Sequence, residues 1–281
     1  MSINPDTILL SALLAGGVAI GATVAIERFG GRLGGILATL PTTIVPASVG
    51  LWIHQQDPAL FADAMHSVPG GMLLNACFLW LWRALPPRLP STKRSTRLTL
   101  MVVFSLSCWV LGAIGLVTFQ GQLLERAIGL AGYAWGLTLA ILVGGLWAAR
   151  DPRPAPKGRR KVGPVALLSR GVFAAAAIGT SIALADIAGP LVAGVAAVFP
   201  AIFLTTMVSI WLAQGEDVQA GAVGPMMLGS TSVSVYALAS AWLFPQLGPW
   251  LGSAGAWVLS IVLVSIPCWM WTRRAPRSRD D

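Results

Sequence analysis

Charged side chains are scarce in this chain, and their scarcity argues against a soluble globular protein. Only 11% of the 281 residues are Asp, Glu, Lys or Arg, whereas 56% are hydrophobic, and the mean hydropathy is +0.74. This composition leaves too little polar surface to coat a water-soluble domain of that length. The sequence therefore predicts a protein whose main partner is the lipid bilayer.

Residue types typical of catalytic and metal sites are also few. The three cysteines lie in apolar stretches without CxxC spacing, and there are only two histidines. The chain has no H-E-x-x-H, G-x-S-x-G or Walker lysine motif. We therefore expect no cofactor and no ATP-driven step. Nucleic acid is not an expected partner either, because the basic residues behind the net charge of +8 flank apolar runs.

Apolar runs long enough to cross a bilayer, which takes roughly 20 helical residues, recur throughout the chain. Their apolar residues are consecutive, rather than alternating as in a membrane barrel, so the predicted fold is an all-α polytopic membrane protein. Nine spans are expected, at residues 8–26, 33–53, 68–85, 98–118, 128–148, 165–185, 191–213, 223–243 and 250–271.

Lysine and arginine are distributed so unevenly that they predict the orientation of these spans. If the carboxyl terminus is cytoplasmic, every basic residue except Arg126 falls on the cytoplasmic side. The amino terminus then lies outside. This bias and the pI of 10.4 favour a bacterial inner (plasma) membrane.

The chain contains an internal repeat with an offset of 159 residues. One unpaired helix separates the two copies, so the second copy is expected upside down in the membrane. The predicted organisation is a four-helix repeat at 1–118, a connector helix and basic loop at 119–164, and an inverted repeat with a basic tail at 165–281. Matching residues, without a gap, are Glu27, Gly30, Gly35, Pro41, Trp52, Gln55 and Asp57 with Asp186, Gly189, Gly194, Pro200, Trp211, Gln214 and Glu216.

Two four-helix units in opposite orientations, fused through one helix, resemble the small multidrug resistance and drug/metabolite transporter superfamily. The segment 34–43, Gly-Gly-Ile-Leu-Ala-Thr-Leu-Pro-Thr-Thr, also resembles GlpM-like bacterial inner-membrane proteins. The first resemblance implies transport. The membrane-embedded glutamate of the small multidrug exporters has no counterpart, because Glu27 is expected at the cytoplasmic end of the first span.

Pro41 and Pro200 both fall well inside an expected span. A proline removes one backbone donor and displaces the carbonyl four residues earlier, so the carbonyls of Leu37 and Ala196 are expected to be free. Lipid cannot satisfy such groups. We predict that polar side chains near them line a central substrate site; the alternative is a plain kink satisfied by neighbouring threonines. The predicted site comprises Thr39, Pro41, Thr42, Thr43, Ser48, Asn75, Pro200, Thr205, Thr206, Ser230, Ser232 and Ser234.

Glu27 and Asp186 end the first helix of each repeat, and glycines follow both. The inverted arrangement places them at opposite membrane faces, where an acid can accept a proton or a cation during gating. We predict coupling or gating residues here; plain interfacial carboxylates are the alternative.

The outer loop between the second and third spans holds His54, Asp57, Asp63 and His66. Two imidazoles and two carboxylates suit a zinc ion. An amphipathic helix at the interface accounts for the same residues, so no metal is predicted.

Together these patterns favour a transporter or exporter of a small solute that works by alternating access, not an enzyme. An accessory or scaffold membrane protein that moves nothing is the main alternative, and an intramembrane enzyme is a weaker one. Neither the solute nor the coupling ion is indicated, and a homodimer is compatible with the sequence.

Overall fold

The structure is a computed structural model that describes residues 5–37, 40–90, 93–126, 129–150, 163–214 and 219–274. Within these ranges the chain forms helices and no strand, which confirms the predicted all-α class. The elements are α1 (Pro5–Leu37), α2 (Ile44–Gln55), α3 (Pro58–Ala84), the 3-10 helix η1 (Pro86–Arg88), α4 (Arg94–Glu125), α5 (Leu130–Ala149), α6 (Pro164–Ala188), α7 (Pro190–Ala196), α8 (Ala201–Gln214), α9 (Gln219–Ser260), the π-helix η2 (Ile261–Ser265) and α10 (Ile266–Arg274).

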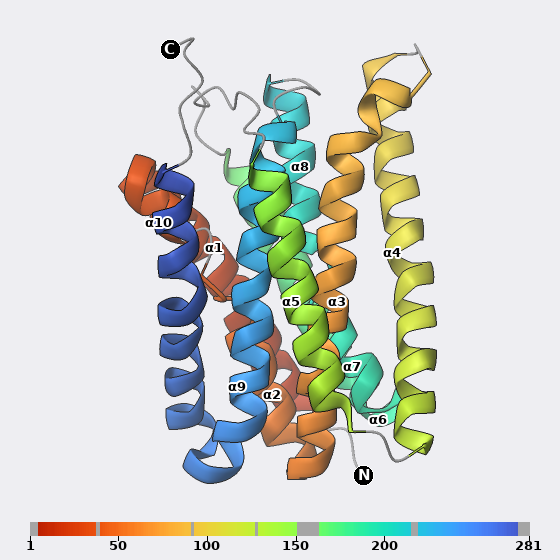
Figure 1. Cartoon of the computed structure of the whole chain (residues 1–281), viewed down its shortest axis with the longest axis vertical. Coiled ribbons are helices and arrows are strands. Elements are labelled where there is room, and N and C mark those ends of the chain that lie inside the picture. Colours follow the sequence, from red (N-terminus) through yellow and green to blue (C-terminus); the bar gives the residue numbers. More distant parts are fainter. Residues whose placement is uncertain are drawn as a thin grey trace.

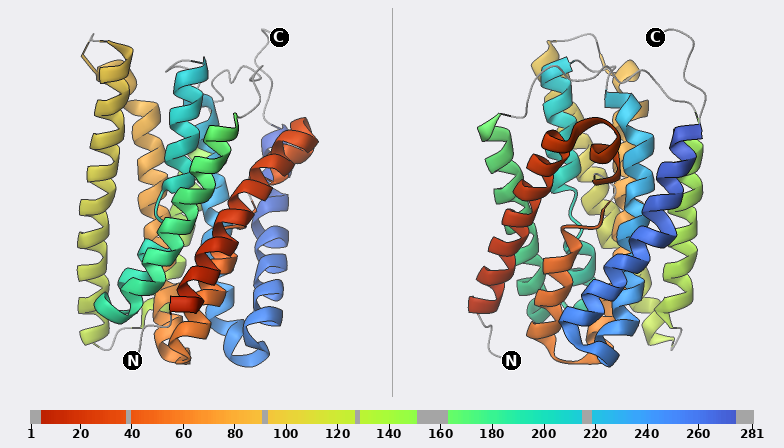
Figure 2. Two further views of the ribbon diagram at one scale, coloured as in Figure 1. Left: turned by 180° about the vertical axis from the view of Figure 1, so that it is seen from behind. Right: turned by 90° about the vertical axis from the view of Figure 1, so that its left-hand side faces the viewer.

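The helices stand side by side in one bundle, with α3 and α9 near the middle of the view, α5 in front of them, and α4 and α10 toward opposite sides (Figure 1). α3 rises from the lower to the upper end of the bundle in this view, while α9 descends beside it. On the reverse side α1 rises and α6 descends against it (Figure 2). Large side chains fill the space between the helices, and Trp82, Trp211, Tyr236 and Phe61 are fully buried.

Five stretches of the described chain are helical, long and apolar enough to cross a membrane. They are Arg94–Glu125, Leu130–Ala149, Leu167–Ala188, Pro190–Leu212 and Val223–Trp271. The outward faces of such helices are apolar; on α4, for example, Leu111 and Ile114 are largely exposed. A surface of this kind suits lipid, and it indicates a membrane protein. The count of nine spans stays a prediction.

The chain turns at the lower end of the bundle through two glycine–proline pairs. Gly189 lies between α6 and α7 with φ +85° and ψ 174°, and Gly248 interrupts α9 with φ +72° and ψ 174°. Pro190 and Pro249 follow them. Proline suits the first position of a helix, because its missing N–H has no partner there in any case. Each pair therefore ends one helix and starts the next.

Alanine at Gly248 is expected to destabilise the protein by about 1–3 kcal/mol, because this backbone conformation is essentially restricted to glycine. No atom lies within 4 Å of the position that its Cβ would take, so backbone strain alone is responsible. The thermal unfolding midpoint of the detergent-purified protein measures the effect. Gly115→Ala, at an equally open but helical position of α4, is the control and should not lower the midpoint. An unchanged midpoint for Gly248→Ala would contradict the assigned turn.

Candidate central site

Both expected proline-bearing spans are interrupted. In the second, α7 ends at Ala196 and α8 starts at Ala201, with Pro200 in the gap. In the first, α1 ends at Leu37 and α2 starts at Ile44, although residues 38 and 39, including the predicted site residue Thr39, lie outside the described residues.

At the second interruption, the carbonyl that accepts a side-chain hydrogen bond is not the one that the sequence predicted to be free. Ala196 was expected to have a free carbonyl, but it accepts a hydrogen bond from the Phe199 N–H at 3.0 Å. The chain tightens here into a turn of the 3-10 type, which pairs groups three residues apart. The Val198 carbonyl instead points out of the turn and accepts from the Asn75 side-chain amide at 2.7 Å. The prediction for Ala196 is therefore wrong, and the polar contact lies two residues later.

Asn75 connects three segments of the bundle. Its Nδ2 donates to Val198, and its Oδ1 accepts from the Trp109 indole N–H of α4 at 2.8 Å. The Trp109 ring also meets the ring of Phe199 edge to face, with centroids 5.2 Å apart. Asn75 is only 2% exposed, so both ends of its amide are satisfied inside the protein. Asn75, Trp109 and Val198 together are called the Asn75 lock below.

Small side chains let α7 lie directly against α3. Ala64, Ser67, Gly71 and Asn75 recur every three or four residues on α3 and so share one face. Ser67 donates to the Leu191 carbonyl at 3.0 Å. A Cβ added at Gly194 would lie 2.0 Å from the Ala64 carbonyl oxygen. α3 thus holds both ends of the short helix α7, through Ser67 at its start and through Asn75 just beyond its end.

A second buried polar chain joins α2 to both arms of α9. The Tyr236 hydroxyl lies 2.8 Å from Ser48 Oγ and 2.7 Å from Ser253 Oγ. Ser48 also donates to the Val45 carbonyl of its own helix at 3.0 Å. These hydroxyl groups are buried and hydrogen-bonded to one another, and they connect the first half of the chain with the second.

The other predicted site residues are divided among local environments. Thr42 and Thr43 are half-buried beside the first interruption, Thr206 is half-buried on α8, and Pro41 and Pro200 are buried. The remaining hydroxyl groups donate to carbonyls of their own helices, which is a common way for membrane helices to satisfy them. They are Thr205, Ser230, Ser232 and Ser234. The structure thus brings Asn75 to one interruption and Ser48 to Tyr236. The four hydroxyl groups just listed donate instead to carbonyls of the helices on which they lie.

Of the two predicted coupling residues, Glu27 and Asp186, the structure describes the side chain of Asp186. The Glu27 side chain lies outside the described part of the chain. Asp186 lies at the end of α6, and its Oδ2 is 3.0 Å from Nε2 of His54 on α2. His54 is 4% exposed in its side chain and Asp186 17%, so this pair is largely shielded from water.

The outer-loop residues do not form a metal centre in the described part of the chain, where no three His, Cys, Asp or Glu side chains gather. His54 faces Asp186 instead of its sequence neighbours. Asp57 caps α3 by accepting from the Ala59 N–H at 2.8 Å. Asp63 and His66 lie in the first turns of α3, before the apolar span. Burial raises the pKa of the Asp63 carboxyl and lowers that of the His66 imidazole, and each group opposes the shift of the other.

Sequence reasoning missed Trp109 and Ser253 as partners in this region. Trp109 carried a usable signal: it lies in the middle of an expected span, whereas tryptophans that anchor a protein at the interface lie near span ends. A buried indole N–H needs an acceptor, and Asn75 supplies one.

Protein-family models, curated proteins and solved structures give no match to this chain, so its function is inferred from its own geometry.

Proposed function

We propose that the protein is a membrane transporter of a small solute, in which two inverted repeats rock about a central site. The observation that carries the proposal is the interruption of one helix in each half of the chain at a proline. Interrupted helices expose backbone groups inside a membrane, and transporters use such groups to bind substrate near mid-depth. The Val198 carbonyl, held by Asn75, is a group of this kind.

Helix positions support the repeat. α6 begins at Pro164 and α2 ends at Gln55; their counterparts under the offset of 159 residues are Pro5 and Gln214, the first described residue of α1 and the last described residue of α8. The gap 197–200 between α7 and α8 corresponds to residues 38–41 under the same offset. The paired elements run in opposite directions through the bundle (Figure 2).

Contacts between α1 and α6 fit a pseudo-twofold axis. A Cβ at Gly16 would lie 3.4 Å from Ala175, which is the repeat counterpart of Gly16. A residue that contacts its own counterpart lies close to such an axis. On either side, Gly179 approaches Ala12, and Gly171 approaches Ile20, which is the same contact with the two halves exchanged. Small residues at this crossing let the helices approach closely.

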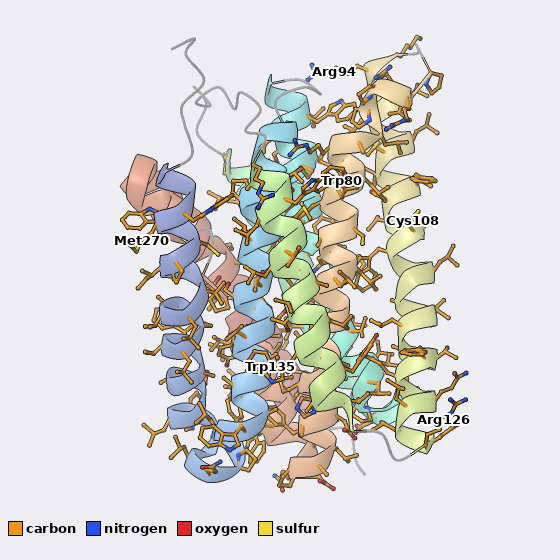
Figure 3. The ribbon with its side chains drawn as sticks, in the orientation of Figure 1. Trp80, Arg94, Cys108, Arg126, Trp135 and Met270 are labelled. Atoms are coloured by element: carbon orange, nitrogen blue, oxygen red, sulfur yellow. The ribbon has the colours of Figure 1, made fainter. Side chains whose placement is uncertain are left out.

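Orientation with the amino terminus outside and the carboxyl terminus cytoplasmic is part of the proposal. α1 begins at the lower end of the bundle and α10 ends at the upper end (Figure 1). Arg94 marks the upper end and Arg126 the lower end (Figure 3). The upper end is thus the cytoplasmic one under the positive-inside rule.

In this mechanism the Asn75 lock defines one state of the second interruption. A solute that donates a hydrogen bond to the Val198 carbonyl replaces the Asn75 amide without leaving that carbonyl unpaired. The exchange keeps this carbonyl paired, but the displaced Asn75 amide loses its acceptor, so a solute that also accepts a hydrogen bond from Asn75 binds best. Thr42, beside the first interruption, and Thr206, on α8, are half-buried and supply further hydroxyl groups.

The test is a screen of metabolites, drugs and ions for compounds that raise the thermal unfolding midpoint of the purified protein, at pH 6 and pH 8. A hit should act on the native chain and fail on a Thr42→Val, Thr206→Val variant. Thr118→Val is the matched control. Thr118 is exposed on α4, and its hydroxyl donates to the Ile114 carbonyl of the same helix at 2.8 Å.

Hits are then assayed for uptake into proteoliposomes. Uptake that survives in the control and is lost in the double variant is the expected result. A well-folded protein that no compound stabilises, or a hit that binds without uptake, would favour an accessory protein.

A further inference from the structure

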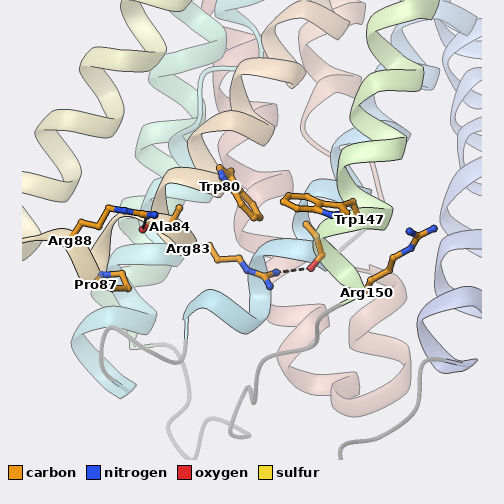
Figure 4. A pocket seen from close by; sticks show the side chains of 8 residues that line it. Trp80, Arg83, Ala84, Pro87, Arg88, Trp147 and Arg150 are labelled. Atoms are coloured by element: carbon orange, nitrogen blue, oxygen red, sulfur yellow. Dashed lines mark hydrogen bonds between the residues drawn. The ribbon is translucent and has the colours of Figure 1, made fainter.

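A cleft of about 740 Å³ opens at the upper end of the bundle, away from the central site (Figure 4). It lies between the ends of α3 and α5. Among the described residues, three arginines and no carboxylate line it. We call it the arginine cleft; its lining residues are Trp80, Arg83, Ala84, Pro87, Arg88, Trp147, Ala148 and Arg150. Its volume is within the range of about 300–1,000 Å³ that is usual for small-molecule sites.

Arg83 forms the inner wall of the arginine cleft. It is 7% exposed, its Nη1 donates to the Ala148 carbonyl at 2.6 Å, and its guanidinium lies 5.5 Å from the centroid of the Trp80 ring. These contacts fix a positive charge in a place with little water. Arg88 and Arg150 are exposed at the rim, and Arg88 donates to the Ala84 carbonyl.

Two tryptophans add an apolar side to this basic cleft. The Trp80 and Trp147 rings lie 4.8 Å apart, and Trp147 is 59% exposed. An exposed indole at a span end belongs at the depth of lipid headgroups. The cleft therefore combines positive charge with a surface that suits glycerol or acyl groups.

The alternative explanation is that these arginines only determine the orientation of the protein in the membrane and offset the negative ends of the helix dipoles of α3 and α5. A helix end carries about half a negative charge, so one helix end does not balance the full charge of an exposed guanidinium group such as that of Arg88 or Arg150. Each guanidinium has five N–H donors, and one carbonyl contact uses only part of this capacity at Arg88. The rim arginines Arg88 and Arg150 therefore offer charge and donors that an anion with several acceptor oxygens can use.

We propose that the arginine cleft binds a phosphate oxyanion. Planar guanidinium groups match phosphate oxygens with paired hydrogen bonds, and basic pockets between helices on the cytoplasmic side of a membrane suit phospholipid headgroups. The phosphate can belong to an anionic phospholipid or be free in solution. Trp80 and Trp147 favour the lipid, because free phosphate has no apolar part to place on them.

The experiment measures binding by native mass spectrometry of the detergent-purified protein titrated with phosphatidylglycerol, with phosphatidylcholine as the zwitterionic comparison. A parallel titration with inorganic phosphate follows the thermal unfolding midpoint. The variants are Arg88→Gln and Arg150→Gln, both at exposed positions. Arg126→Gln, which removes the same charge at the lower end, is the matched control (Figure 3).

Preferential binding of phosphatidylglycerol that weakens about tenfold in each variant, but not in the control, supports the proposal with a lipid as the source. A midpoint shift with inorganic phosphate that depends on the same two arginines, without lipid preference, supports it with free phosphate as the source. Binding of neither ligand, or an equal loss in Arg126→Gln, overturns it.

Discussion

Replacing Gly194 by alanine is expected to destabilise the protein by more than about 3 kcal/mol, at the upper end of what overpacking costs. The added Cβ would lie 2.0 Å from the Ala64 carbonyl oxygen and 2.1 Å from Ser67 Oγ. The first of these is a backbone atom inside α3, so no change of rotamer relieves the clash. α7 would have to move away from α3, and the Ser67 hydrogen bond to the Leu191 carbonyl would stretch.

Denaturant or thermal unfolding of the purified protein measures this loss. Gly136→Ala is the matched control: it adds the same methyl group on the exposed face of α5, where no atom lies within 4 Å. Alanine has a higher helix propensity than glycine by about 0.8–1.0 kcal/mol, so the control should be neutral or slightly stabilising. Equal stability of Gly194→Ala and the control would mean that α7 does not lie against α3.

Replacing Asn75 by leucine is expected to cost about 2–6 kcal/mol, because it leaves the Val198 carbonyl and the Trp109 indole N–H buried without their partner. Each unsatisfied buried group costs about 1–3 kcal/mol. Asn75→Asp is a second variant: an ionised carboxylate still accepts from Trp109 but cannot donate to Val198. We expect the aspartate variant to be destabilised as well, with the added cost of a buried charge.

A double-mutant cycle with Trp109→Phe tests the lock directly. Asn75 and Trp109 are in contact at 2.8 Å, so their two substitutions should be clearly non-additive. Gln246→Leu is the control for loss of an amide, since Gln246 is exposed and bonds the Trp242 carbonyl of its own helix. Additive effects of the Asn75 and Trp109 substitutions would contradict the lock.

Composition and local pattern were enough to predict part of this structure. Runs of consecutive apolar residues predicted the all-α class, and a proline deep inside an apolar run predicted where helices are interrupted. Asn75 was singled out as a polar side chain inside an expected span that could line a substrate site. Each of these signals is local, since it depends on the chemistry of residues within a few positions of one another.

The partners themselves were beyond the sequence. Asn75 meets Val198 from 123 positions away, and Ser48 meets Tyr236 from 188 positions away. Which carbonyl lacks a backbone hydrogen bond depends on the type of turn. In the 3-10 turn the Ala196 carbonyl accepts from the Phe199 N–H, whereas an open kink would have left it without a donor. Arg83, Arg88 and Arg150 were interpreted only as topology signals, because the cleft between them exists only once α3 and α5 lie together.

Asn75 has Ser234 as its repeat counterpart, and Trp109 has Cys268. Ser234 donates to Ser230 of its own helix, and a thiol is a far weaker donor than an indole. Under the proposed repeat the two halves are therefore unequal in chemistry: the second interruption has an amide and an indole beside it, and the positions equivalent to these two carry a hydroxyl and a thiol. If the protein rocks as proposed, this difference acts as a built-in preference for one resting state, and the free energy that holds Asn75 in place is a contribution that a solute has to offset before the other state becomes populated.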